Sequence, residues 1–246
     1  MTDIEIQSLP AMGDNYIYLL VYHDAVIVVD PGVAAPVQTT LRAQALKLTH
    51  ILLTHHHADH TAGCHALAGD CEVIGPKDTR VPWATRAVGE GDSFEIADLK
   101  YSVLDVPGHT DPHLAFHVEH HLFCGDSLFA GGCGRLFEGS PVQMWNSLLK
   151  IRSLDDDTIV YCGHEYTLNN LEFAVSIEPG NSALARRLEQ VRQQREAGVA
   201  TVPFRLGEDK LTNPFLRVDD AELQVALGAT DAVTALAELR ARKDRW

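Results

Sequence analysis

The chain has 246 residues, 46% of them hydrophobic, which is enough for one large domain or a domain with an appendage. Asp and Glu number 34 against 20 Lys and Arg, and the resulting net charge of −14 disfavours general binding to nucleic acid or to an anionic membrane surface. The five cysteines are odd in number and form no C-x-x-C pair, which argues against a disulfide framework and favours a reducing compartment.

The amino-terminal residues and the hydropathy of the chain predict neither a leader nor a membrane anchor. Met1-Thr2-Asp3-Ile4-Glu5 is acidic and lacks the basic-then-apolar pattern of a signal peptide. No run approaches the roughly 18 apolar residues that a membrane span requires. We therefore expect a soluble, cytoplasmic protein.

The first two-thirds of the chain have the short apolar runs of a strand-rich α/β domain. Residues 4–9 alternate weakly and residues 15–22 form an apolar run with β-formers. Residues 26–29 are continuously β-branched, as in a buried strand, and end at the turn signal Asp30-Pro31-Gly32. Helices are expected over residues 35–47, from residue 63, and over 143–154, and further strands over residues 73–74, 94–96, 101–106, 114–118 and 122–124.

The character of the sequence changes after residue 164. Residues 169–177, 183–197 and 221–242 are helical stretches with few β-formers, and Leu184, Leu188 and Val191 give the second its helical period. We predict a catalytic domain over residues 1–165 and a smaller, mostly helical domain over residues 166–246.

One segment concentrates potential metal ligands: Thr54-His55-His56-His57-Ala58-Asp59-His60. Neutral imidazole is the commonest protein ligand for zinc-like ions, and a carboxylate adds a hard, charged donor. Alternate residues of an extended stretch point the same way, so His55 and His57 can converge on one ion. Asp59 and His60 can turn toward a second ion where the chain bends into a helix. The pattern therefore predicts a site for two metals, the alternative being a solvated loop that is rich in histidine.

Three further apolar runs each end at a potential ligand. They lead to His109, Asp126 and His164, and a Gly stands directly before each of these three residues. Gly permits the sharp turn that such a strand end needs. We expect these loops to gather with the first cluster at one end of a buried sheet.

With these ligands in order, the chain resembles the metallo-β-lactamase superfamily and, within it, the glyoxalase II (hydroxyacylglutathione hydrolase) family. The superfamily is indicated by the histidine motif, and the family by the segments 107–110, 125–129, 131–139 (Gly-Gly-Cys-Gly-Arg-Leu-Phe-Glu-Gly), 161–170 (Tyr-Cys-Gly-His-Glu-Tyr-Thr-Leu-Asn-Asn), 213–217 and 242–246. The resemblance spans nearly the whole chain. It implies an α/β fold, an αββα sandwich with the metals at one edge, followed by a smaller helical domain.

The resemblance also implies the role of each ligand. His55, His57 and His109 would hold one divalent ion; Asp59, His60 and His164 would hold the other; and Asp126 would bridge both. His56 and His113 would not be ligands, and Asp30 would brace the ligand loop without touching metal. Zinc is the expected metal, with iron or manganese as alternatives, because His and carboxylate donors accept all three.

The implied reaction is the second step of methylglyoxal detoxification. A metal-bridged hydroxide would attack the thioester of S-D-lactoylglutathione, or of a related S-2-hydroxyacylglutathione, giving D-lactate and glutathione. Asp59 and Asp126 would be the catalytic carboxylates. The leaving thiol has a pKa of about 8.5, so no strong general acid is required. The only expected partner is this small thioester substrate. The protein itself is expected to be a monomer.

The implied glutathione contacts are Arg135, Phe137, Tyr166, Arg240 and Lys243. Arg240 and Lys243 belong to the basic tail, residues 240–246. The alternative to a substrate-binding role is a purely structural one, in which these cations are favoured by the dipole at the end of a helix. Phe137 stands where the family commonly has an aromatic residue with a hydroxyl, which predicts weaker glutathione binding. Asp111-Pro112 also departs from the family pattern, beside His109.

Other functions remain as alternatives. A lactamase or lactonase of the superfamily would not need the basic tail, and a persulfide dioxygenase would use one iron held by two His and one Asp. A nuclease would require a basic surface, which the net charge of −14 argues against. An oxygen-reduction module would require a flavin domain, and the sequence indicates none.

Overall fold

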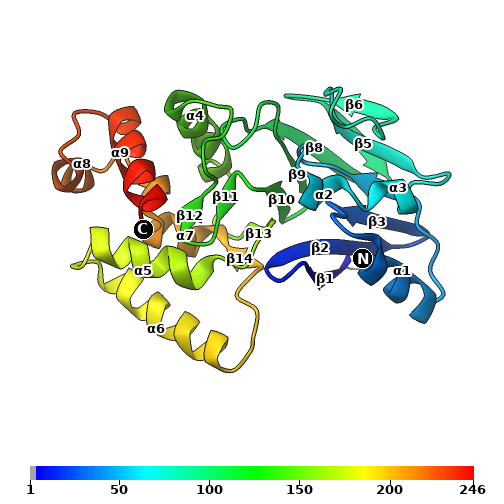
Figure 1. Ribbon diagram of the computed structural model, residues 1–246, viewed down its shortest axis with the longest axis horizontal. Helices are drawn as coiled ribbons and strands as arrows, with labels where there is room; N and C mark the ends of the chain where they lie inside the picture. Colours follow the sequence, from blue (N-terminus) through cyan, green and yellow to red (C-terminus); the bar gives the residue numbers. More distant parts are fainter. Residues whose placement is uncertain (1–3) are drawn as a thin grey trace. The chain divides into compact units, whose positions relative to one another are not determined.

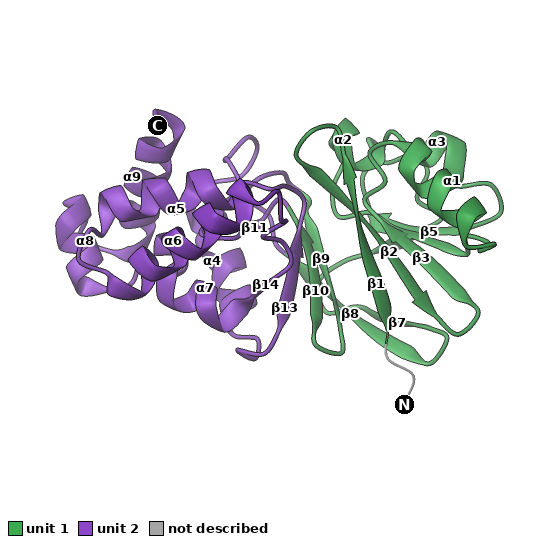
Figure 2. Ribbon diagram, turned by 90° about the horizontal axis from the view of Figure 1, so that it is seen from below, with its two compact units in different colours: residues 1–105, 112–125 green, residues 106–111, 126–246 purple. Residues whose placement is uncertain are grey.

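The computed structural model describes residues 4–246 (Figure 1). These residues form two compact units (Figure 2). Unit 1 comprises the chain up to Asp105 together with Pro112–Gly125, and unit 2 comprises Val106–Asp111 and Asp126–Trp246. The first three residues, part of the segment used to argue against a leader, lie outside the described residues. The boundary expected near residue 165 stays a prediction.

Unit 1 contains a six-stranded sheet in the order β1-β2-β3-β4-β5-β6. The first three strands pair antiparallel and the last three join them in parallel. The strands are β1 (Glu5–Ala11), β2 (Asn15–Tyr22), β3 (Ala25–Val29), β4 (His50–Leu52), β5 (Glu72–Pro76) and β6 (Arg86–Val88). Continuous apolar runs form β2 and β3 because both faces of this sheet are covered.

Four antiparallel strands of a second sheet complete the strands of unit 1. They run in the order β10-β9-β8-β7, with bounds β7 (Ser93–Ile96), β8 (Leu99–Asp105), β9 (Leu114–Val118) and β10 (His121–Gly125). Tyr18 of β2 packs its ring 5.6 Å from that of Phe123 of β10, so the two sheets share a core.

Helices cover the other face of the six-stranded sheet. They are α1 (Ala34–Ala43), α2 (Ala58–Thr61) and α3 (Cys64–Leu67). Val37 of α1 and Cys64 of α3 join a buried cluster with Ile17, Val28 and Ile51 of the strands. Helix α1 ends four residues earlier than the predicted 35–47, and Ala45 adopts a positive φ of 54° where the chain leaves the helix.

Unit 2 consists mainly of helices with two short strand pairs. Its elements are β11 (Leu128–Phe129), β12 (Gly132–Cys133), α4 (Pro141–Arg152), β13 (Ile159–Cys162), α5 (Thr167–Ile177), α6 (Ser182–Glu196), β14 (Phe204–Arg205), α7 (Leu206–Thr212), η1 (Pro214–Leu216), α8 (Ala221–Leu227) and α9 (Ala232–Asp244). Leu171, Leu184 and Leu188 join α5 to α6 in an apolar cluster.

The single helical stretch expected over residues 221–242 is wrong, because two helices occupy it. Gly228 closes α8 with a left-handed φ of 69°, which favours glycine. Asp231 then caps α9 in a capping box with Thr234. None of the helices within residues 4–246 has both the length and the apolar run needed to cross a bilayer.

Candidate metal centre

The histidine motif follows β4, as predicted, and its first residues are buried. Leu114 N donates to the Thr54 carbonyl at 2.8 Å, which holds the segment against the start of β9. The chain is still extended at His57 (φ −58°, ψ 143°) before α2 begins. The ring centroids of His55 and His57 lie 4.7 Å apart, and those of His55 and His60 lie 4.2 Å apart. The extended stretch and the helix turn therefore bring these imidazoles together, as their spacing predicts.

Asp30 braces this segment from the end of β3. Its Oδ1 accepts from Thr54 N at 2.8 Å, and its Oδ2 accepts from Thr54 Oγ1 at 2.7 Å. The same Oδ2 lies 2.9 Å from Nδ1 of His60. A carboxylate only accepts hydrogen bonds, so this pairing places the ring proton on Nδ1 and leaves the Nε2 lone pair for a metal. The bracing role expected for Asp30 matches these contacts.

Asp59 lies at the start of α2 and is oriented by a residue that the sequence did not single out. Asn15 Nδ2 donates to Asp59 Oδ2 at 3.1 Å, and that oxygen lies 3.7 Å from His60 Nε2. Gly32 passes directly behind, because a Cβ there would lie 1.8 Å from the Asp59 carbonyl oxygen. Only glycine therefore allows the turn after β3 to approach α2 this closely.

The two histidines that were not expected to bind metal have other surroundings. His113 is fully buried, stacks on His55 with ring centroids 4.5 Å apart, and has Nδ1 3.2 Å from the Leu114 carbonyl. His56 has Nε2 3.3 Å from Arg80 Nη1 and Nδ1 3.9 Å from Asp78 Oδ2. These contacts suit positioning roles in unit 1.

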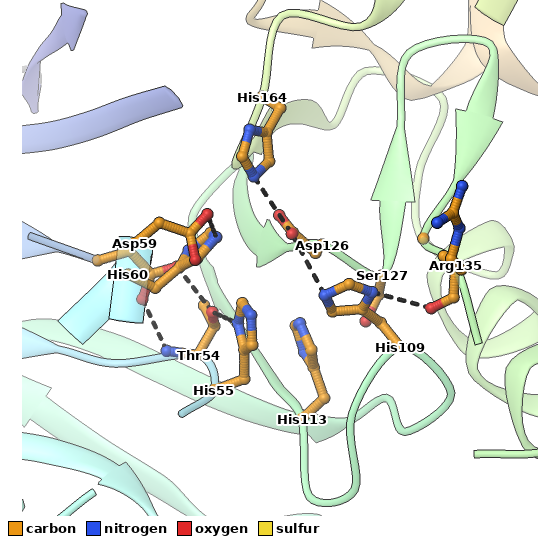
Figure 3. A network of polar contacts seen from close by, with 12 residues as sticks. Thr54, His55, Asp59, His60, His109, His113, Asp126, Ser127, Arg135 and His164 are labelled. Carbon is orange, nitrogen blue, oxygen red and sulfur yellow. Dashed lines mark hydrogen bonds and ion pairs between the residues drawn. The ribbon is translucent and has the colours of Figure 1, made fainter. Parts of the chain in front are cut away.

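In unit 2, two imidazoles converge on one carboxylate (Figure 3). Nε2 of His109 lies 3.4 Å from Asp126 Oδ2, and Nε2 of His164 lies 3.3 Å from the same oxygen. All three side chains are buried. Three donors from segments 17 to 55 residues apart thus meet at one point, as expected for the ends of β8, β10 and β13.

A loop of residues 133–139 wraps around His109. Nδ1 of His109 lies 2.9 Å from the Arg135 carbonyl oxygen, and Phe137 N donates to the His109 carbonyl at 3.2 Å. A Cβ on Gly134 would lie 2.0 Å from the Asp126 carbonyl oxygen, so the loop needs glycine to pass. The Arg135 carbonyl fixes the proton of His109 on Nδ1 and directs Nε2 toward Asp126. No side-chain pattern in the sequence marks this backbone acceptor.

Among the described residues, no cysteine belongs to the groups of His and Asp atoms that lie close enough together to hold a metal ion. Burial raises the pKa of Cys133 to about 11, an effect that the Arg240 guanidinium only partly offsets. Burial likewise raises the pKa of Cys162 far above its usual range. The groups that converge in unit 2 are imidazole and carboxylate.

Of the predicted substrate contacts, three lie beside His109 or His164. Tyr166 stacks on His164 with ring centroids 4.7 Å apart and an interplanar angle of 6°. Phe137 packs edge-on against His109 at 5.2 Å and is 60% exposed. The Arg135 guanidinium lies 5.9 Å from the Phe137 ring centre. Aromatic and cationic side chains thus adjoin the two histidines of unit 2.

The two predicted contacts from α9 differ in exposure and in pairing. Arg240 is buried, donates through Nη1 to the Cys133 carbonyl at 2.8 Å, and lies over the ring of Phe215 at 5.3 Å. Lys243 donates to the carbonyl of Asn169 at 3.2 Å and also to its side-chain oxygen. Burial and the charge of Arg240 lower the pKa of Lys243 to about 8.

Groups of His and Asp atoms in the described residues lie close enough to hold divalent ions. The donor chemistry fits such an ion, because the Nδ1 atoms of His60 and His109 each face a protein acceptor that orients the ring.

Comparisons with known proteins cover the whole chain. The family description "Metallo-beta-lactamase superfamily" matches residues 12–164, and "Hydroxyacylglutathione hydrolase C-terminus" matches residues 165–246. A hydroxyacylglutathione hydrolase of Synechococcus sp. is 47% identical over 99% of this chain and 100% of its own length. One from Methylococcus capsulatus is 47% identical over 98% of each chain.

A solved structure agrees on the fold. The crystal structure of ETHE1 from Myxococcus xanthus superposes with a TM-score of 0.67 over 98% of each chain, at 24% identity. At that identity it bears on the fold alone. The predicted fold class, a metallo-β-lactamase sandwich followed by a mostly helical part, is confirmed.

Proposed function

The chain belongs to the hydroxyacylglutathione hydrolase family of the metallo-β-lactamase superfamily, and from that premise we propose that it hydrolyses S-D-lactoylglutathione to D-lactate and glutathione. Related S-2-hydroxyacylglutathiones would be substrates too. The observation that carries the proposal is the match to such hydrolases over the full chain, including the helical residues 165–246. A lactamase or lactonase would not require that second part.

The proposed metal centre consists of seven His and Asp ligands. His55, His57 and His109 would hold one divalent ion, Asp59, His60 and His164 the other, and Asp126 would serve both. The proposal is supported by imidazoles whose Nδ1 atoms are anchored and by the convergence of His109 and His164 on Asp126. Zinc is the proposed metal because the donors are nitrogen and oxygen, which iron and manganese also accept.

Divalent ions held by these residues would lower the pKa of a water molecule toward neutrality and stabilise negative charge on the thioester oxygen. The chain's own groups prepare that chemistry. Asp126 is acceptor-only and has two oxygens, so it can serve two cations at once. Asn15 holds the Asp59 carboxylate in place. The leaving thiolate needs no strong acid at about pH 8.5 and above, and only modest assistance at neutral pH.

Specificity for glutathione would come from Arg135, Phe137, Tyr166, Arg240 and Lys243. The exposed aromatic rings of Phe137 and Tyr166 adjoin the ligands, and so could contact the acyl-thioester end of the substrate. Lys243 would pair with a substrate carboxylate, because its present hydrogen bonds go to the neutral Asn169. Arg240 already has internal partners, so its contribution would be partly structural.

We propose that the enzyme acts as a monomer, since all proposed ligands come from one chain. We also propose a cytoplasmic location, which suits five cysteines without a disulfide among the described residues.

The test is thioester loss from S-D-lactoylglutathione by protein whose metal content has been measured. A β-lactam, a lactone and glutathione persulfide serve as rival substrates in the same preparation. His57→Ala and His56→Ala form a matched pair, since both remove a half-buried imidazole from one motif but only His57 is a proposed ligand. Loss of activity and metal in the first and not the second is expected. Turnover of a rival substrate without thioester loss would overturn the proposal.

A further inference from the structure

Asp244, near the end of α9, lies between two arginines. Its Oδ1 accepts from Arg240 Nε at 3.1 Å and lies 3.0 Å from Arg240 Nη2. The same oxygen accepts from Arg135 Nε at 3.2 Å. One carboxylate oxygen therefore joins the last turn of α9 to the loop of residues 133–139, across 109 residues of sequence.

Two backbone carbonyls of that loop make further contacts. Arg240 Nη1 donates to the Cys133 carbonyl at 2.8 Å. The Arg135 carbonyl accepts from His109 Nδ1 at 2.9 Å. Arg135 thus links Asp244 to His109, because its side chain contacts Asp244 and its carbonyl contacts His109.

Without the contact between Asp244 and Arg135, which we call the tether, the loop of residues 133–139 would be less firmly held. The Arg135 side chain is 56% exposed, so solvent competes for it, whereas the Arg240 side chain is only 9% exposed and is held over Phe215. Asp244 ties the exposed arginine to the buried one. Because a histidine ligand takes its tautomer and ring angle from the acceptor at Nδ1, a shift of the Arg135 carbonyl would change how His109 presents Nε2.

We propose that Asp244 is a positioning residue for the metal centre: it fixes residues 133–137 against α9, and through the Arg135 carbonyl it sets the orientation and tautomer of His109. The inference rests on the proposed function only in taking His109 as a metal ligand. It gives the acidic residue of the basic tail a role separate from substrate binding, and it couples the helical C-terminal residues to metal affinity.

The experiment measures zinc affinity of metal-free protein by competition with a chelator, without substrate. Asp244→Asn should weaken zinc binding about fivefold, the scale of one partly exposed charge pair. Glu238→Gln is the matched control, because it breaks an ion pair of similar exposure with Arg242 (2.8 Å) on the same helix. The control should bind zinc like the unmodified protein.

A second measurement separates positioning from general destabilisation. Arg135→Ala removes the same tether from its exposed end, and it serves as the test if Asp244→Asn fails to fold. Arg135→Ala and the double variant should weaken zinc binding as much as Asp244→Asn alone, because all three break one series of contacts. Equal effects of Asp244→Asn and Glu238→Gln, or additive effects of the two tether variants, would overturn the proposal. A protein that lacks thioesterase activity would refute the proposed function and leave this zinc measurement unaffected.

Discussion

Replacing Asp30 with asparagine should weaken metal binding by changing the tautomer of His60. The Asp30 carboxylate is buried and accepts from Thr54 N, Thr54 Oγ1 and His60 Nδ1, at 2.8, 2.7 and 2.9 Å. In asparagine one oxygen becomes an NH₂ group. The Thr54 N–H needs the remaining oxygen, so the NH₂ faces His60 Nδ1 and favours a ring that accepts there and carries its proton on Nε2. Such a ring cannot offer Nε2 to a metal.

The backbone should tolerate this change. Asp30 has a φ of 50°, in the left-handed region that asparagine enters as readily as aspartate. The cost is therefore confined to the hydrogen bonds and the ligand. Loss of charge-assisted bonds should lower the free energy of unfolding of the metal-free protein by about 1–3 kcal/mol. Loss of the orienting partner should weaken zinc binding by roughly 10–100-fold, or about 1.4–2.7 kcal/mol.

Two assays separate these terms: urea unfolding of metal-free protein, and zinc affinity by chelator competition. Asp78→Asn is the control, since Asp78 Oδ2 lies 3.9 Å from Nδ1 of His56, which is not a proposed ligand. That variant should keep its zinc affinity. If Asp30→Asn bound zinc as tightly as the unmodified protein, the argument from the His60 tautomer would be refuted.

Three further variants test the other parts of the site. Asp126→Ala should lower turnover by more than about a hundredfold and release at least one ion, because two cations held close together need a shared anion; metal analysis with steady-state kinetics checks this. Phe137→Tyr should lower KM for the glutathione thioester several-fold, on the scale of ~1 kcal/mol for one new hydrogen bond, with little change in kcat. The pKa of Lys243 is lowered to about 8, first by burial and then by Arg240, so KM should rise as pH passes 8 and its charge is lost; Lys243→Arg should flatten that rise. Over pH 8 to 10.5 the unfolded chain keeps a proton that the folded chain has lost, so the free energy of unfolding should increase with pH there, and a pH series of urea unfolding measures it.

The sequence was sufficient to predict the strands that end near the proposed ligands. β4, β10 and β13 each end within three residues of a donor, and β8 ends four residues before His109. Apolar runs specify strands and glycine specifies the turns after them, so these features are encoded locally. Asp30 could be placed because it ends a strand at a turn signal. The helical character of the last third was equally visible, since it depends on composition and period.

The contacts that orient the ligands could not be predicted in the same way. His109 is oriented by the carbonyl of Arg135, and every residue has a carbonyl, so no side-chain pattern marks it. Asn15 reaches Asp59 across 44 residues, and Asp244 reaches Arg135 across 109. Such pairs depend on tertiary packing. The break between α8 and α9 was missed because Gly228 lies in an otherwise continuous helical pattern.

The basic tail illustrates why charge alone did not define a role. The number of basic residues in the tail predicts a cationic patch, which would attract an anionic substrate to a chain whose net charge is −14. The structure divides that charge according to its partners. Arg240 is buried and its charge is balanced by Asp244, so it contributes little to attraction and much to holding the loop beside His109. Lys243 donates instead to the oxygens of Asn169, and its charge is the one that a substrate carboxylate could neutralise.

The lowered pKa of Lys243 follows from that arrangement, because burial beside Arg240 is not compensated by a bonded carboxylate. A group whose charge is destabilised before the ligand arrives gains most when an anion binds, which makes Lys243 the stronger candidate for substrate selection and Arg240 the stronger candidate for structure.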